Sequence, residues 1–241
     1  MARMQLSTSR IEIPVGAARM PAFVAKPAAG GARSAVIVLM EAYGLVANFE
    51  RDVERIARMG YVAVAPDLYH RQAPDNRADY ADLKKAIGLM RNLKDEEFLA
   101  DMRATVAHLR ASPEVGARPI GVAGFCMGGR LSFLAACELP ELRASAPFYG
   151  GGIGALLDRA PKISCPLHLF FGQLDYFIPQ EEVRAIEQRL RALGKTFALE
   201  NYAGAVHGFC CEERAESYHP EAARDAWAKL EAFLAANLRA S

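Results

Sequence analysis

Short apolar runs recur along the chain and alternate with segments of helical periodicity. Near the N-terminus, residues 5–16 and 18–27 alternate between apolar and polar positions, which predicts a β-hairpin. The later runs are apolar throughout, as is typical of strands in a parallel sheet covered on both faces. They lie at residues 34–40, 61–66, 119–124, 144–150 and 166–172, and a further run that alternates more lies at 196–202.

The segments between these runs repeat their apolar positions with the period of an α-helix. A strand that alternates with a helix predicts a doubly wound α/β fold with a mostly parallel sheet and helices on both faces. We expect one domain over residues 1–241. The polar segment 66–94 shows no strand signal and is expected to cap the carboxyl edge of the sheet, where such folds bind ligands. The predicted helices span residues 48–60, 95–110, 126–139, 179–194 and 221–238.

Composition narrows the function classes. The chain has 241 residues, is 52% hydrophobic and carries a formal net charge of +1, so it gives no electrostatic case for nucleic acid or an anionic membrane as a partner. No apolar run reaches the length of a membrane span, and the first residues lack the apolar core of a signal peptide. The five cysteines are odd in number and suggest no disulfide framework. We expect a cytoplasmic monomer or small homo-oligomer.

The segment Gly124-Phe125-Cys126-Met127-Gly128 stands where an apolar strand gives way to a helix. It fits the nucleophile-elbow pattern, in which the residue between the glycines takes a strained backbone conformation and small neighbours leave room for the reversal. The helix that follows would direct its N-terminal N–H groups at the thiol and lower its pKa. The alternative is a buried structural cysteine beside a tight turn.

Two further residues favour catalysis over packing. Asp175 follows an apolar strand, and His207 lies in a glycine-flanked loop after the next strand. Nucleophile, acid and histidine in this chain order form the triad arrangement of α/β-hydrolases. Each residue taken alone has a simpler explanation, since aspartate often forms turns and a single histidine is often a surface residue. Three residues at the right junctions in the right order predict a catalytic site.

With these residues in place, the chain resembles the dienelactone hydrolase (carboxymethylenebutenolidase) family over nearly its whole length. The motifs that carry the resemblance are LMEAYGL at 39–45, APDLYHRQAP at 65–74, GFCMGG at 124–129, GQLDYFIP at 172–179 and AVHGF at 205–209. The resemblance implies an α/β-hydrolase fold and hydrolysis of small esters or lactones, without a metal or organic cofactor. It implies that Glu41 holds the resting thiol and helps it to ionise. The oxyanion would be bound by the backbone N–H groups of Met127 and Ala42.

The resemblance also indicates where the substrate would bind. In well-studied members of the family that this chain resembles, two arginines bind a carboxylate of the substrate. This chain has Cys211 at one of these positions, with Arg214 nearby but out of register, and Lys84 or Lys85 lies closest to the other. Lysine lacks the bidentate fork of arginine, which puts an acidic dienelactone substrate in doubt. The candidate substrate-binding residues are Tyr43, Arg71, Lys84, Lys85, Phe209 and Cys211.

Two other functions fit the same residues. A broad carboxylesterase or thioesterase would share the catalytic residues and differ in its pocket. A non-catalytic binding or redox-sensing protein could use Cys126 together with Cys210 or Cys211. An aspartate and a histidine at triad positions argue against the latter, because a sensor needs neither.

Overall fold

The structure is a computed structural model that describes residues 4–239. These residues form two compact units, which are residues 4–121 with 238–239, and residues 122–237. The prediction of one domain over residues 1–241 stays a prediction, because one domain can contain two such units. The catalytic residues predicted from the elbow and the two loops all belong to the second unit.

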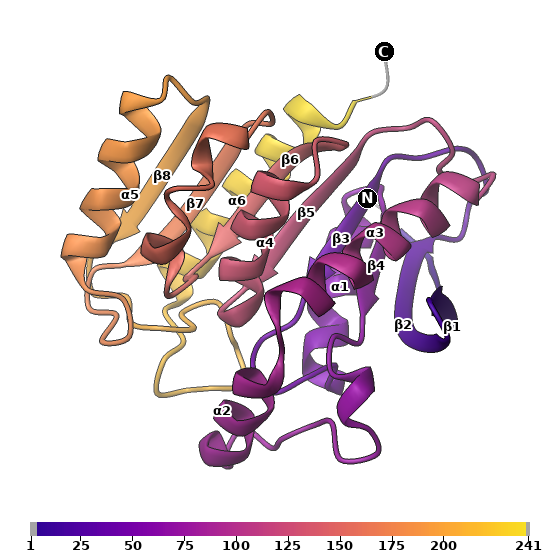
Figure 1. The fold of residues 1–241 in the computed structure, drawn as a ribbon, viewed down its shortest axis with the longest axis horizontal. Coiled ribbons are helices and arrows are strands. Elements are labelled where there is room, and N and C mark those ends of the chain that lie inside the picture. The colour runs from indigo at the N-terminus through magenta and orange to yellow at the C-terminus, as the bar shows by residue number, and fades with distance from the viewer. Residues whose placement is uncertain (1–3, 240–241) are drawn as a thin grey trace. The chain divides into compact units, whose positions relative to one another are not determined.

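In the first unit the strands lie in the order β1-β2-β4-β3. The predicted hairpin is confirmed: β1 and β2 are antiparallel, and β2 also pairs antiparallel with β4, whereas β3 and β4 are parallel. The helices α1 and α3 pack on opposite faces of these strands (Figure 1). The elements are β1 (Leu6–Val15), β2 (Ala18–Pro27), β3 (Ala35–Leu39), α1 (Ala47–Arg58), β4 (Val62–Pro66), the 3-10 turn η1 (His70–Gln72), α2 (Leu83–Asn92) and α3 (Asp95–Ala111).

In the second unit the strands lie in the order β5-β6-β7-β8, and β6, β7 and β8 run parallel. Here α4 and α6 cover opposite faces of the strands (Figure 1). With the first unit this gives the α/β-hydrolase fold that the sequence predicts. The elements are β5 (Ile120–Phe125), α4 (Met127–Glu138), β6 (Leu142–Phe148), η2 (Ile153–Leu156), η3 (Ala160–Lys162), β7 (Leu167–Gly172), α5 (Gln180–Ala192), β8 (Phe197–Tyr202) and α6 (Pro220–Asn237).

A stack of aromatic rings joins the strands of the second unit. Phe125 at the end of β5 lies 4.7 Å from Phe148 of β6, and Phe148 lies 4.1 Å from Phe170 of β7, measured between ring centroids. Trp227 of α6 covers Phe125 at 5.5 Å. Rings of this size contribute much of the buried apolar area of a core. The stack therefore fixes the strand ends from which the loops with the candidate site residues leave.

Beyond Pro66, which ends β4, the segment 66–94 has no strand, as the sequence predicts, but it contains the helix α2, which the sequence pattern does not predict. The Asp82 side chain accepts a hydrogen bond from the backbone N–H of Lys85 at 3.0 Å and so caps the start of α2. An aspartate in this position satisfies an N–H group that has no partner inside the helix. The polar composition of the segment hid a short helix whose buried face includes Ala86 and Leu89.

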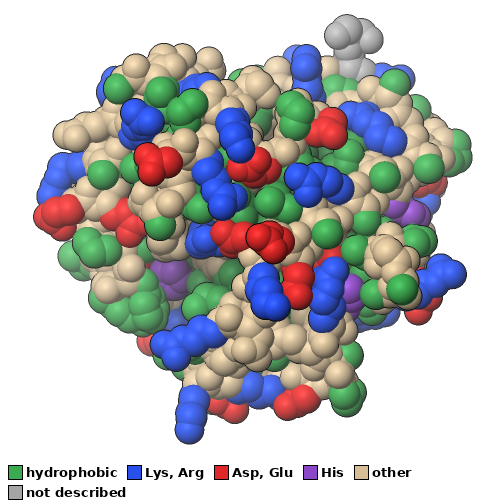
Figure 2. All heavy atoms as spheres, viewed as in Figure 1, with side chains coloured by type: hydrophobic (Ala, Val, Ile, Leu, Met, Phe, Trp, Pro, Cys, Tyr) green, Lys and Arg blue, Asp and Glu red, His purple; other side chains and the backbone are tan. Residues whose placement is uncertain are grey.

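The surface agrees with the near-neutral charge. On the face shown in Figure 2, basic and acidic side chains are interspersed and no large area carries one sign. Among the described residues, no helix is both long enough and apolar enough to cross a membrane.

The tight backbone approach around the elbow makes a testable prediction. A methyl group on Gly124 would lie 1.9 Å from the carbonyl oxygen of Gly128, which is backbone and cannot rotate away. We expect Gly124→Ala to lower the free energy of unfolding by about 3 kcal/mol or more. Urea denaturation measures this change. Gly88→Ala is the matched control, because Gly88 lies inside α2 with open space around it and its replacement should stabilise the protein by up to about 1 kcal/mol. Equal denaturation midpoints for Gly124→Ala and the unmodified protein would contradict this account of the elbow.

Candidate active site

Cys126 takes the strained conformation expected of a nucleophile elbow. Its φ is 55° and its ψ is −116°, between the last residue of β5 and the first residue of α4. A non-glycine residue in this backbone conformation destabilises the fold by on the order of 1–3 kcal/mol, and it persists only where the surrounding structure imposes it. Two backbone hydrogen bonds do so: the Cys126 N–H donates to the Phe148 carbonyl at 3.0 Å, and its carbonyl accepts from the Gly129 N–H at 2.9 Å.

Glycine at 129 follows from the same geometry. A methyl group there would lie 2.2 Å from the Phe148 carbonyl oxygen, so α4 could not approach the end of β6. Cys126 directly precedes α4, so the positive end of this helix dipole lies at the candidate site, where it stabilises an oxyanion. Met127 is the first residue of α4, consistent with its predicted role as an oxyanion donor.

Asp175 and His207 meet at this thiol. The Nδ1 atom of His207 lies 2.8 Å from Oδ2 of Asp175, and Nε2 lies 3.1 Å from Sγ of Cys126. Asp175 follows β7 and His207 follows β8, and both are buried, whereas Cys126 is only partly so. The parallel strands carry these loops to one edge of the sheet. The structure thus brings together three residues that lie far apart in the sequence.

The environment of His207 favours its charged form. Burial of the ring opposes the charge, but the neighbouring Cys126 sulfur and the hydrogen-bonded Asp175 carboxylate outweigh it and raise the pKa of His207 to about 10. A protonated imidazole beside a thiol is the arrangement that activates cysteine nucleophiles.

Two aromatic rings flank the His207 imidazole, and sequence reasoning had assigned neither. Tyr149 lies 5.3 Å away and is buried, with a φ of 37°, whereas Phe177 lies 5.0 Å away and is half exposed. The only sequence signal for Phe177 was its place two residues after Asp175, whose Oδ1 accepts the Phe177 N–H at 2.9 Å.

The remaining candidates of the second unit are buried. Phe209 has no exposed surface and packs against Tyr149 and Tyr202 at 5.3 and 5.2 Å. This packing supports the His207 loop, and a direct contact of Phe209 with substrate stays a prediction. Cys211 is buried, and its Sγ lies 3.7 Å from Oε2 of Glu213.

Two other cysteines are removed from this chemistry. Burial raises the pKa of Cys137 to about 12 and that of Cys165 to about 11, so both remain thiols at neutral pH. They serve as packing residues.

In the first unit two of the three basic candidates, Arg71 and Lys85, have ion-pair partners of their own. Both Nη atoms of Arg71 donate to the carboxylate of Asp101 at 2.8 Å, and Asp101 is fully buried. A buried carboxylate needs such a partner, so this pair holds the Arg71 guanidinium to α3. Lys85 forms an ion pair with Asp75, and Lys84 is exposed. The sequence did not reveal the Arg71 pair.

The loop after β3 carries the other three candidates of the first unit. Glu41, Ala42 and Tyr43 are buried, and the hydroxyl of Tyr69 donates to the Ala42 carbonyl at 3.1 Å. The Tyr43 carbonyl accepts the N–H of Ala78 at 3.0 Å. Segment 66–94 therefore fixes this loop, while the roles assigned to Glu41, Ala42 and Tyr43 stay predictions.

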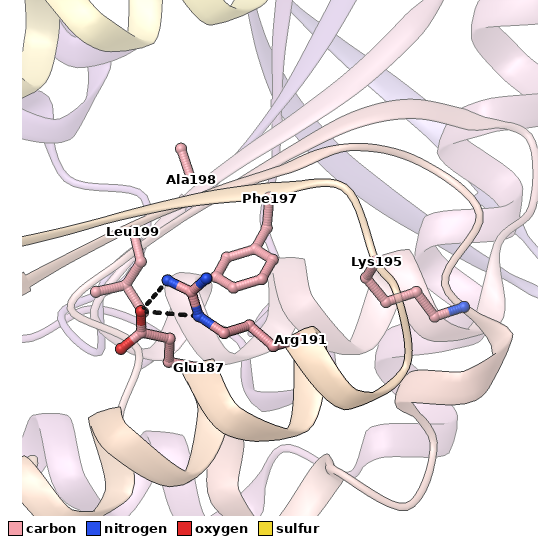
Figure 3. A pocket seen from close by; sticks show the side chains of 6 residues that line it. All are labelled: Glu187, Arg191, Lys195, Phe197, Ala198 and Leu199. Carbon is pink, nitrogen blue, oxygen red and sulfur yellow. Dashed lines mark hydrogen bonds and ion pairs between the residues drawn. The ribbon is translucent and has the colours of Figure 1, made fainter.

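A hollow of about 500 Å³ lies at the other end of the second unit, between α5 and β8 (Figure 3). Arg191 and Glu187 lie one turn apart on α5 and form an ion pair at 2.7 Å on its side of the hollow. Phe197 pairs with Leu167 at the start of β7, whereas Asp175 follows the end of that strand, so this hollow is separate from the candidate site. Its lining residues are Glu187, Arg191, Lys195, Phe197, Ala198 and Leu199.

Among the residues that the structure describes, no cluster of three or more His, Cys, Asp or Glu side chains could hold a metal ion.

Comparison with known proteins identifies the family. A model of the dienelactone hydrolase family matches residues 20–238. The chain belongs to this family. It is 36% identical to the "Putative carboxymethylenebutenolidase" of Synechocystis sp. over 98% of this chain and 99% of that protein. The solved "Putative Dienelactone Hydrolase" of Klebsiella pneumoniae is 34% identical, with a TM-score of 0.87 over 96% of this chain and 99% of the other. A solved dienelactone hydrolase-like promiscuous phosphotriesterase from metagenomic libraries, 22% identical with a TM-score of 0.84 over 97% and 99%, shares the fold.

The contacts of His207 predict its titration. Because Cys126 and Asp175 raise its pKa to about 10, the imidazole should stay protonated as the pH rises through 8 and lose its proton only near 10. Cys126→Ser replaces the sulfur with a neutral hydroxyl and should shift this titration toward lower pH. Nitrogen NMR of histidine-labelled protein measures both. His168 is an internal control, since burial is the chief cause that lowers its pKa and Cys126→Ser should leave it unchanged. A His207 that titrates near its ordinary value of about 6.5 would overturn this assignment.

Proposed function

We propose that this hydrolase cleaves small carboxylic esters or lactones through a covalent thioester on Cys126. The observation that carries the proposal is the chain of contacts from Asp175 Oδ2 to His207 Nδ1, at 2.8 Å, and from His207 Nε2 to Cys126 Sγ, at 3.1 Å. Membership of the dienelactone hydrolase family supports it. Both distances fall within the reach of a nucleophile, its base and the group that orients the base.

The first half of the reaction would acylate the enzyme. The Cys126 thiolate attacks the carbonyl carbon, and the negative charge that moves to the carbonyl oxygen faces the N-terminus of α4. When the bond to the leaving oxygen breaks, Nε2 of His207 gives that oxygen its proton. The alcohol departs, or in a lactone the opened chain stays attached to the acyl group.

The second half would release the acid. A water molecule gives a proton to Nε2 of His207 as its oxygen attacks the thioester carbonyl, and the C–S bond then breaks. The products are the carboxylic acid, the Cys126 thiolate and a protonated His207. Asp175 keeps the imidazole in the orientation that both halves require.

One observation favours neutral esters or thioesters over acidic lactones. An anion in a closed pocket needs a cation with a good donor geometry. Arg71 is held by Asp101, and Cys211 stands at a position where well-studied relatives have arginine. A carboxylesterase or thioesterase activity of this same triad is therefore the second candidate function.

Removal of the nucleophile gives the direct test. Cys126→Ala should lower the turnover of p-nitrophenyl acetate by on the order of 10⁴-fold or more, because the thioester cannot form. Cys137→Ala and Cys165→Ala should retain most of the activity, since burial keeps both thiols out of the chemistry. Release of p-nitrophenol measures turnover, and mass spectrometry detects the acetylated cysteine. Near-normal turnover by Cys126→Ala would rule out the thioester mechanism and would leave a binding or redox role for this thiol.

The Asp175–His207 pair can be tested as a unit. Asp175→Asn should keep the fold but lower kcat by roughly 10³- to 10⁴-fold, because the amide stabilises the wrong imidazole tautomer. His207→Ala should lower kcat at least as much. The double variant should be little worse than the worse single variant, because residues that act as one unit lose their effect together. Losses that multiply in the double variant would show that the two residues do not share one mechanism.

A further inference from the structure

Three large apolar side chains are exposed on the loop between β7 and α5. Leu174 is 61% exposed, Tyr176 is 70% exposed and Phe177 is 47% exposed. The described chain exposes only two other large hydrophobic side chains, Met4 and Leu83. A single exposed apolar residue needs no explanation, but three within four positions form a patch of the kind that binds ligands. We call these three residues the ledge.

One residue of the ledge, Phe177, lies beside the His207 imidazole. The Phe177 ring is 5.0 Å from the His207 ring at an interplanar angle of 77°, and the Tyr176 ring is 4.3 Å from that of Phe177. Asp175 fixes both sides of this contact, since Oδ2 lies 2.8 Å from His207 Nδ1 and Oδ1 accepts the Phe177 N–H. In Figure 2, hydrophobic side chains gather at the lower left, near the start of α5.

A comparison with Tyr149 separates packing from binding. Tyr149 meets the same imidazole at 5.3 Å but is only 1% exposed, so it supports the ring from inside the protein. Phe177 meets the imidazole and leaves about half of its own surface open. A ring needed only for support would be covered, as that of Tyr149 is. The open surface of Phe177 is available to a ligand.

The proposed reaction says which part of a substrate would lie there. The atom that receives the proton from His207 Nε2 is the oxygen of the leaving group. The leaving group must therefore stand beside the imidazole, while the acyl carbon is attached to Cys126. Of the two rings against that imidazole, only Phe177 has exposed surface to offer.

We propose that the ledge binds the leaving group, and that Phe177 gives this enzyme a preference for esters of aromatic or bulky apolar alcohols. The inference rests on the proposed ester hydrolysis by Cys126 and His207. It concerns the alcohol side of the substrate only. All acetates give the same acetyl-enzyme, so the preference must appear in acylation and be absent from the hydrolysis of the thioester.

A pair of acetates tests this preference. We expect Phe177→Ala to lower kcat/KM for phenyl acetate by on the order of tenfold, through the loss of one aromatic contact, and to lower it much less for trifluoroethyl acetate. The different reactivities of the two esters cancel when each is compared between the variant and the unmodified protein. Phe177→Tyr keeps the ring and should keep the preference. Phe197→Ala is the matched control, because it truncates a phenylalanine in the separate hollow beside β8.

Equal losses of kcat/KM on both esters would mean that Phe177 acts only by supporting His207. No loss on either ester would mean that Phe177 contacts neither leaving group. Both results would overturn the proposal.

A binding measurement tests the ledge independently of the catalytic mechanism. Phenol titrated into Cys126→Ala should shift the NMR signal of His207, and the shift should vanish when Phe177→Ala is added. This shift would still show the binding surface if the protein cleaved no ester, whereas its absence in an active enzyme would overturn the ledge and leave the hydrolysis intact.

Discussion

The candidate site depends on how closely bare backbone can pack at the end of β5. The chain reverses at Cys126 because Gly124 and Gly129 carry no side chain where the carbonyl oxygens of Gly128 and Phe148 stand. Any larger residue would separate α4 from β6 and release the strained conformation of Cys126. The aromatic stack of Phe125, Phe148 and Phe170 joins the same strands, so core packing helps to maintain the strain. Strain of this kind persists only when the surrounding structure over-determines it.

Asp175 is the second fixed point, and it serves two neighbours at once. One carboxylate oxygen meets His207, and the other accepts the backbone N–H of Phe177. Its side chain is fully buried, which makes both contacts necessary, because a buried carboxylate without partners costs several kcal/mol. The orientation of the imidazole and the position of the apolar ring beside it are therefore set by one group.

The sequence predicted the parts of this site that local rules determine. Strand ends, elbow glycines and the order of Cys126, Asp175 and His207 can be read from short segments, since parallel strands carry their loops to one edge. The pairing of Arg71 with Asp101 could not be read, because the two residues are 30 positions apart and only the fold brings them together. The helix α2 was missed because its capping aspartate and polar face look like those of a loop. The exposure of Phe177 depends on what covers a loop, and an apolar residue between Asp175 and a helix gives no sign of it.

The unequal burial of the cysteines has a consequence for damage by oxidants. Peroxides attack the thiolate form, and burial holds the pKa of Cys137 near 12 and that of Cys165 near 11, so neither supplies an appreciable amount of it at neutral pH. Cys126 is partly exposed, stands at a helix N-terminus and has a histidine 3.1 Å away. Of these three sulfurs, that of Cys126 is therefore the one most accessible to an oxidant in solution. If Cys126 acts as the proposed nucleophile, its oxidation would stop hydrolysis while the protein stays folded, and reduction of the first oxidation product, a sulfenic acid, would restore the thiol.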